Sequence, residues 1–491
     1  MKKELPVLTG EGVTSIFRNA VYLLGARWLT MAVRFFYAIA LARKLGPELY
    51  GLYNYGMSLY LAFLPMTALG LGIVLSREIG RDRTIGARIS AQALILRTVA
   101  GILASLLCGI IGWFSEGGPE MKMIIVIFSL ALLGRCLSTW TQEVFTAHEA
   151  SEHNFKQQAI FRTLEVVFGL LVLFSGGGIL AIAVVHLVSW WLQVLFGFYL
   201  VRKHLIVKLP FWAWRGLKNL FIQGLSIGLG AIFINWLNQG PLVLFRHCVG
   251  DEPSLGQFAL IMQIFSILAN VPVVAVMASY PILSRSVMRF DTKDRIFAET
   301  FLRAALILGT VVGLFAMGLG PRLVKLIFGP RYLEAGYLLG PTLFLLIPWT
   351  IGNIIWAVYL ARGLFFLPTI FSCVAAAVLT FCMPWFVAFM QTFGAVLATG
   401  VSMSLWALAL ILIYAILGEL NIRRAVLRPG VSVLLAIGVY FLFESKSVLY
   451  ALPASLVALI IGITAFRVFT PDDRSALTSL VHRAFQSRTK M

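Results

Sequence analysis

Arginines inside long apolar segments are the residues of this chain best suited to chemistry. Arg27 and Arg34 fall in the first such segment, Arg97 in the third and Arg135 in the fourth. A charge at mid-bilayer costs about 2.5–3.5 kcal/mol on insertion scales, so such residues usually face a wet cavity or a partner. Several charges of one sign therefore predict a path for an anionic substrate.

The spacing of Arg27 and Arg34 places both on one face of a helix. Seven residues correspond to about two turns, or roughly 10 Å along the axis. This pair could pass an anionic headgroup along the bilayer normal. The alternative is that each side chain extends to its nearer interface, which is easier for Arg34 because Arg43 and Lys44 follow it.

Two interpretations stay open for Arg97 and Arg135. Each could line a cavity, or each could pair with an acidic residue such as Glu143 or Glu165. Arg162 lies nearer a predicted membrane edge, and we expect its side chain to extend to the interface.

Glu143, Glu165 and His186 are the candidates for binding a coupling ion or proton. Their alternative role is to neutralise a neighbouring arginine. The second half of the chain offers only Arg303 as a basic residue within a span, also near an edge.

Composition identifies a polytopic membrane protein. Hydrophobic residues make up 60% of the 491 residues and charged residues 12%, with a mean hydropathy of +0.90. We interpret the net charge of +19 as the excess of lysine and arginine that membrane proteins carry in cytoplasmic loops, and not as a sign of nucleic-acid binding. No cysteine or histidine spacing indicates a metal site, and no cofactor is expected.

About fourteen apolar stretches are each long enough to cross the bilayer as a helix. They cover about residues 16–41, 50–75, 89–113, 122–147, 156–175, 179–201, 217–244, 255–281, 297–320, 335–360, 364–390, 394–417, 429–443 and 447–466. With this even number, the four most basic loops lie on one side, so both termini are predicted to be cytoplasmic. These loops are Arg77–Arg88, Arg202–Lys218, Arg285–Arg295 and Arg423–Arg428.

An internal repeat divides the first twelve spans. Residues 45–53 and 249–258 enter the second and eighth spans similarly, and Pro65 and Pro272 lie deep within them. The matching tripeptides 75–77 and 283–285 follow, at an offset of about 205–208 residues. Six helices per copy predict two equally oriented lobes related by an axis along the membrane normal.

The predicted organisation follows from the spans and the repeat. It comprises a cytoplasmic N-terminus (1–15), an N-lobe (16–201), an interfacial linker (202–216), a C-lobe (217–417), two further helices (418–467) and a cytoplasmic tail (468–491).

Sequence motifs disfavour an enzyme. There is no GxxxxGK[ST] phosphate loop, HExxH or GxSxG motif. A membrane glycosyltransferase or polymerase would need a sizeable, acidic external loop, and none is predicted. That class remains the rival interpretation outside transport.

Three short motifs resemble the N-terminal signature of polysaccharide-transporter flippases. They are Leu45-Gly46-Pro47-Glu48-Leu49-Tyr50-Gly51-Leu52-Tyr53, Leu69-Gly70-Leu71-Gly72 and Ser76-Arg77-Glu78-Ile79-Gly80-Arg81-Asp82. This family belongs to the multidrug/oligosaccharidyl-lipid/polysaccharide (MOP) exporter superfamily. The resemblance implies two six-helix lobes around a central cavity in the plasma membrane.

The resemblance also implies the substrate and the partners. A polyprenyl-diphosphate-linked oligosaccharide would move from the inner to the outer leaflet, and its pyrophosphate would meet the arginines. Membrane lipids, a polysaccharide polymerase and glycosyltransferases would be partners.

Two other transporters of the superfamily remain as alternatives. Lipid II flippases carry a characteristic Arg-Asp stretch in the first helix, where this chain has Arg34-Phe35-Phe36. A drug/cation antiporter would carry acidic cavity residues, whereas basic residues predominate within the spans here.

Overall fold

The computed structural model describes residues 10–204, 214–249, 251–288, 293–417, 420–445 and 447–469. Every regular element in these residues is a helix, and twelve helical segments are long and apolar enough to cross a membrane. This confirms the predicted all-α polytopic membrane fold. Most of the predicted linker (205–213) and of the tail (470–491), like residues 1–9, lie outside the described residues.

The α-helices are α1 (Gly10–Ala68), α2 (Leu71–Arg81), α3 (Gly86–Ser115), α4 (Pro119–Ala147), α5 (Ser151–Phe174), α6 (Ile179–His204), α7 (Trp214–Cys248), α8 (Glu252–Met288), α9 (Lys293–Ile327), α10 (Leu333–Phe344), α11 (Leu346–Ala361), α12 (Phe366–Ile416), α13 (Arg428–Glu444) and α14 (Val448–Ala465).

Two of the twelve segments are longer than one crossing requires, and each contains a break. Gly46 interrupts α1 with φ 75° and ψ 173°, and Gln391 interrupts α12 with φ 52° and ψ −133°. Glycine adopts the first conformation without a side-chain clash, and Pro47 suits the first turn that follows. Both breaks fall in predicted loops, but the count of fourteen spans stays a prediction.

A second break separates α1 from α2. Leu69 and Gly70 have φ values of 48° and 65°, and α7 packs directly against them. A Cβ atom on Gly224 would lie 2.5 Å from the Leu69 carbonyl oxygen, and one on Gly228 would lie 2.8 Å from the Leu69 carbonyl carbon. The Gly224–Gly228 pair thus permits a close approach of two backbones.

Equivalent positions of the internal repeat contact each other. A Cβ atom on Gly51 would lie 2.7 Å from the Gly256 nitrogen, and these glycines occupy matching places in the two copies. Contact between equivalent residues is the arrangement expected beside a pseudo-two-fold axis. The lobe boundaries and the direction of the axis stay predictions.

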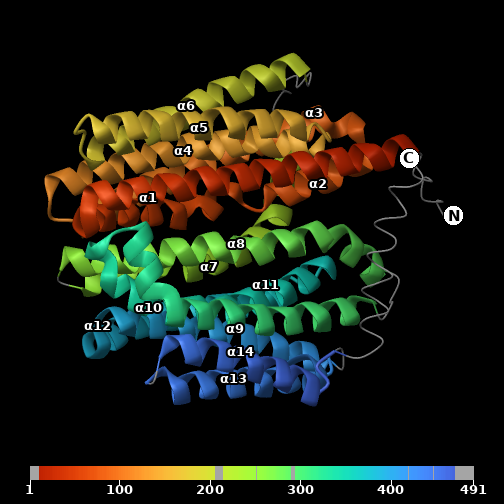
Figure 1. Cartoon of the computed structure of the whole chain (residues 1–491). Coiled ribbons are helices and arrows are strands. Elements are labelled where there is room, and N and C mark those ends of the chain that lie inside the picture. The colour runs from red at the N-terminus through yellow and green to blue at the C-terminus, as the bar shows by residue number, and fades with distance from the viewer. Residues whose placement is uncertain are drawn as a thin grey trace. The chain divides into compact units, whose positions relative to one another are not determined.

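The chain forms two compact units. The first contains residues 1–260 and 365–398, and the second contains residues 261–364 and 399–491. Within the first unit, α4 packs between α3 and α6, and α5 packs on α1 (Figure 1). Within the second, α9 packs against α10, α11 and the α13–α14 pair.

Arg303 of α9 is fully buried in the second unit, although the sequence places it near a membrane edge. Its Nε donates to the Glu299 carbonyl and its Nη1 donates to the Val468 carbonyl at 2.8 Å. The residues that follow α14 therefore cover this charge.

The close packing at Gly224 predicts a stability effect. Gly224→Ala should lower the free energy of unfolding by about 1–3 kcal/mol, because the new methyl group must displace backbone. Thermal unfolding of the detergent-solubilised protein measures this. Gly438→Ala is the matched control, since no atom lies within 4 Å of its Cβ position. Equal unfolding midpoints for the two variants would contradict the packing argument.

Candidate functional site

Five polar side chains form a connected cluster within the first unit. Tyr60 comes from α1, Arg135 from α4, Arg162 and Glu165 from α5, and His186 from α6. Tyr60, Arg162 and His186 are each at most 2% exposed. We refer to these five residues as the polar cluster.

Arg162 is held by four neighbours, so the expectation that it extends to the interface is wrong. Its guanidinium donates to the Glu165 carboxylate, to Ser189 Oγ at 3.2 Å and to Gln193 Oε1 at 2.7 Å. The guanidinium carbon also lies 3.9 Å from the centroid of the Trp190 ring. The missed signal is spacing: Arg162 and Glu165 share one face of α5, and Ser189 and Gln193 share one face of α6.

His186 links Glu165 to α1. Its Nδ1 lies 2.6 Å from Glu165 Oε1, and its Nε2 lies 3.1 Å from Trp190 Nε1 and 3.0 Å from the Tyr60 hydroxyl. An indole N–H can only donate, so Nε2 is the acceptor and Nδ1 carries the proton donated to Glu165. A second proton on His186 would remove the acceptor that Trp190 requires.

Arg135 completes the cluster. Its Nη1 donates to the Tyr60 hydroxyl at 2.6 Å, and its guanidinium carbon lies 5.0 Å from the centroid of the Trp190 ring. The Tyr60 hydroxyl and the Trp190 N–H share the single lone pair of His186 Nε2 as acceptor. The result is a continuous hydrogen-bonded chain from Arg135 to Arg162.

Positive charge exceeds negative charge around the cluster. Arg34 is half-buried and interacts electrostatically with Glu165 and His186. The charges of Arg34 and Arg135 also act on Arg162, so this region holds three arginines and the one carboxylate of Glu165. Arg27 is exposed and lies two turns before Arg34. Among the described residues, neither Arg27 nor Arg34 has a hydrogen-bond or ion-pair partner.

Arg97 forms an ion pair with Glu143, which is one of the two interpretations left open for it by the sequence. It is 1% exposed, and its Nη2 lies 2.6 Å from both carboxylate oxygens of Glu143. A Cβ atom on Gly72 would meet Glu143 Oε1 at 2.6 Å. The glycine in the Leu69–Gly72 motif therefore leaves room for this carboxylate, which joins α3 to α4 and is not bonded to the polar cluster.

Metal binding has no evident basis in the described part of the chain. No group of three or more histidine, cysteine, aspartate or glutamate side chains in it could hold an ion.

Comparison with known families identifies the chain at this point. The family model described as "Polysaccharide biosynthesis protein" matches residues 16–287, which is more than half of the sequence. The chain belongs to this family. No curated protein matches the sequence.

Solved structures of transporters share the fold. The lipid II flippase MurJ, in an inward closed conformation, has a TM-score of 0.66 at 14% identity, over 92% of this chain and 98% of that one. An inward-facing multidrug resistance MATE transporter of the MOP superfamily has a TM-score of 0.63 at 16% identity, over 81% and 97%. The eukaryotic MATE transporter AtDTX14 has a TM-score of 0.59 at 15% identity, over 81% and 95%.

The family match confirms the family resemblance, and the chain shares its fold with a transporter of the MOP superfamily. This member of the family is a multi-pass membrane protein with the fold of flippases and transporters.

The buried pair of Arg97 and Glu143 predicts a large stability effect. Glu143→Gln should lower the free energy of unfolding by about 3–5 kcal/mol, because Arg97 would stay buried without a counter-charge. Thermal unfolding measures the change. The double variant Arg97→Met/Glu143→Leu should recover most of the loss.

Glu149→Gln is the control for this experiment, because Glu149 pairs with Arg83 where both side chains are exposed. Its effect should stay below about 1 kcal/mol. An unfolding midpoint unchanged by Glu143→Gln would show that this pair does not stabilise the protein.

Proposed function

We propose that this protein is a flippase that moves a polyprenyl-diphosphate-linked oligosaccharide from the inner to the outer leaflet. The observation that carries the proposal is the excess of arginine over carboxylate at the polar cluster. Membership of a polysaccharide biosynthesis family supports the choice of cargo.

The arginines suit a pyrophosphate for a physical reason. A guanidinium presents donors in a planar fork that matches phosphate oxygens, and it stays charged at every physiological pH. Arg34 and Arg135 pair with no carboxylate among the described residues, so a dianionic group could neutralise both. Such neutralisation would offset the cost of holding these charges within the membrane.

The predicted arginine set divides into two roles in this proposal. Arg27, Arg34 and Arg135 bind the pyrophosphate, with Arg27 contacting it two turns away from Arg34 on the same helix. Arg97 is assigned to its ion pair with Glu143 and not to the cargo, because the Glu143 carboxylate accepts from its Nη2 and already supplies its counter-charge.

Topology and partners form part of the same proposal. We place the protein in the plasma membrane with both termini cytoplasmic, on the basis of the four basic loops. Glycosyltransferases would supply the cargo on that side, and a polysaccharide polymerase would use it on the other.

Glu165 and His186 are proposed to bind a coupling proton during alternating access, with Glu165 as the group that takes it up, because His186 Nδ1 already carries a proton and Nε2 accepts from Trp190. They share a hydrogen bond of 2.6 Å, and both lie within reach of the charges that the cargo would neutralise. Glu143 is the weaker candidate because its carboxylate already pairs with Arg97.

A lipid II flippase is the second candidate. The likeness to MurJ extends over 92% of this chain, and any polyprenyl diphosphate would suit the same arginines. The two functions differ in the sugar and not in the charged group, so transport must be measured with both cargoes.

The cationic site predicts a transport defect on charge removal. In proteoliposomes, Arg34→Gln and Arg135→Gln should each lower the rate of translocation of a fluorescent polyprenyl-diphosphate-linked oligosaccharide by at least about tenfold. That factor corresponds to loss of about 1.4 kcal/mol, the lower end for a charged hydrogen bond. Lysine at either position should retain part of the rate.

Lys122→Gln is the matched control, since Lys122 lies near the start of α4 and contacts Trp113 rather than the cluster. Full activity of both arginine variants would remove them from the site. Transport of lipid II alone would favour the second candidate, and drug efflux without lipid transport would favour an antiporter.

The coupling proposal predicts a separate phenotype. An imposed pH gradient should change the translocation rate of the wild-type protein, and Glu165→Gln should abolish this response while exchange without a gradient continues. Glu149→Gln, in which an exposed carboxylate is removed, should respond to the gradient as the wild type does. A gradient response retained by Glu165→Gln would exclude Glu165 as the proton site.

A further inference from the structure

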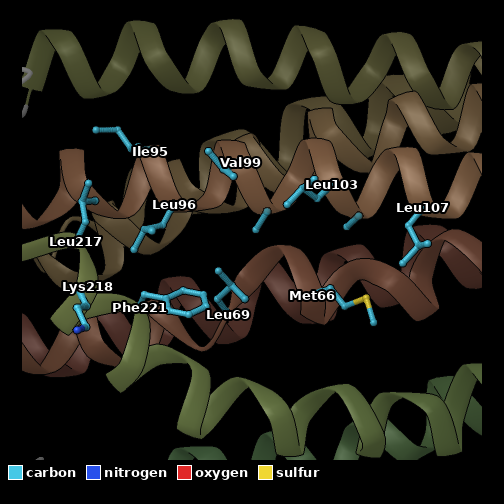
Figure 2. Close-up of a pocket in the computed structure, with 12 residues that line it drawn as sticks. Met66, Leu69, Ile95, Leu96, Val99, Leu103, Leu107, Leu217, Lys218 and Phe221 are labelled. Atoms are coloured by element: carbon cyan, nitrogen blue, oxygen red, sulfur yellow. The ribbon is translucent and has the colours of Figure 1, made fainter. Parts of the chain in front are cut away.

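An apolar groove of about 700 Å³ lies in the first unit, between the end of α1, α3 and α7 (Figure 2). Six of its lining residues matter here: Met66, Val99, Ala100, Leu103, Phe221 and Lys218. We refer to it as the apolar groove.

Residue size on α3 explains why this surface is concave. Ala100 and Ala104 lie one helical turn apart and leave space, while Val99 and Leu103 project beside them and are 54% and 63% exposed. An exposed apolar surface at the depth of the bilayer core would contact hydrocarbon chains. Its shape suits a long apolar chain lying along α3.

Charge marks one end of the apolar groove. Lys218 is the one charged residue among those that line it, and Figure 2 shows Lys218 and Leu107 near opposite ends. Along α3, the lining runs from Ile95 to Leu107, a rise of about 18 Å, which is more than half of a hydrocarbon core of about 30 Å. The fitting ligand is therefore a long chain with an anionic head.

The predicted topology identifies which leaflet supplies this ligand. Lys218 ends the basic segment 202–218, which the positive-inside rule places on the cytoplasmic side. A cargo synthesised there would present its phosphate at Lys218 and its chain along α3.

We propose that the apolar groove binds the polyprenyl chain of the cargo as it enters from the cytoplasmic leaflet, with its phosphate beside Lys218 before that phosphate reaches Arg27, Arg34 and Arg135. This inference rests on the proposed function and adds a chain-binding surface to it. The groove and the polar cluster share helix α1, on which Met66 lies six residues after Tyr60. Helix α3 likewise has two faces, since Leu96 lines the groove while the neighbouring Arg97 pairs with Glu143.

Binding of a radiolabelled polyprenyl phosphate to the full-length protein in detergent tests the proposal. Ala100→Trp should weaken binding by at least about tenfold, because the indole would occupy the volume of several methylene groups, each worth about 0.8 kcal/mol. Leu106→Trp is the matched control, since Leu106 is exposed on α3 and does not line the groove.

Lys218→Gln provides an independent measurement that leaves the groove intact. It should weaken binding of polyprenyl phosphate but not of uncharged polyprenol, and Lys218→Arg should restore the wild-type affinity. Equal effects of Ala100→Trp and Leu106→Trp would overturn the proposal. So would displacement of the probe by phosphatidylglycerol at concentrations at which polyprenyl phosphate itself competes, which would indicate an ordinary lipid site.

Measurements of binding and of translocation distinguish an error in the groove proposal from an error in the flippase proposal. Wild-type binding and translocation by Ala100→Trp would overturn the groove alone. Groove-dependent binding by a wild-type protein that translocates no polyprenyl-diphosphate cargo would overturn the flippase proposal and leave the groove assigned.

Discussion

A charge within the hydrocarbon core must find a counter-charge, a hydrogen-bond partner or water, and Glu165 satisfies that constraint for the interior of the first unit. Its carboxylate accepts from Arg162 and from His186, and His186 connects to Tyr60. These contacts fix the faces that α5 and α6 turn towards each other and towards α1. Because Glu165 carries one negative charge, it cannot neutralise Arg34 and Arg135 as well, and the site keeps an excess of positive charge.

Close helix packing supports this arrangement. Gly224 and Gly228 let α7 contact the break between α1 and α2, and Gly51 and Gly256 let the two copies of the repeat touch. In a membrane, association of helices depends on such van der Waals contacts, since lipid is as apolar as the side chains it replaces. Gly72 does the same for a polar contact, because it leaves space for the carboxylate of Glu143.

A lipid-linked cargo presents two chemistries, and α1 and α3 carry surfaces suited to both. The second part of α1 contributes Tyr60 to the polar cluster and Met66 to the apolar groove. Helix α3 directs Arg97 towards α4, and Leu96, Leu103 and Leu107 towards the groove. A pyrophosphate and a hydrocarbon chain could thus be bound by the same few helices without placing either group in an unfavourable environment.

Sequence alone determined the membrane fold, the positions of two of the helix breaks and the family, whereas the break at Leu69 and Gly70 falls inside the predicted span 50–75. Runs of apolar residues fix where helices cross, and the loops predicted around Gly46 and residue 391 are where α1 and α12 break. The basic loops indicate an orientation in the membrane, and the motifs around Gly46 and Gly70 carry the family resemblance. All of these signals are local, so a single chain is enough to find them.

Only the tertiary structure decided which charges are paired. By sequence, Arg97 and Arg135 are alike: each lies in an apolar segment with no glutamate three or four residues away. In the folded protein, Arg97 pairs with Glu143 and Arg162 pairs with Glu165, whereas among the described residues the Arg135 guanidinium contacts a tyrosine hydroxyl and aromatic rings but no carboxylate. The physical reason is that a partner depends on the rotation and depth at which two helices pack, and hydropathy specifies neither.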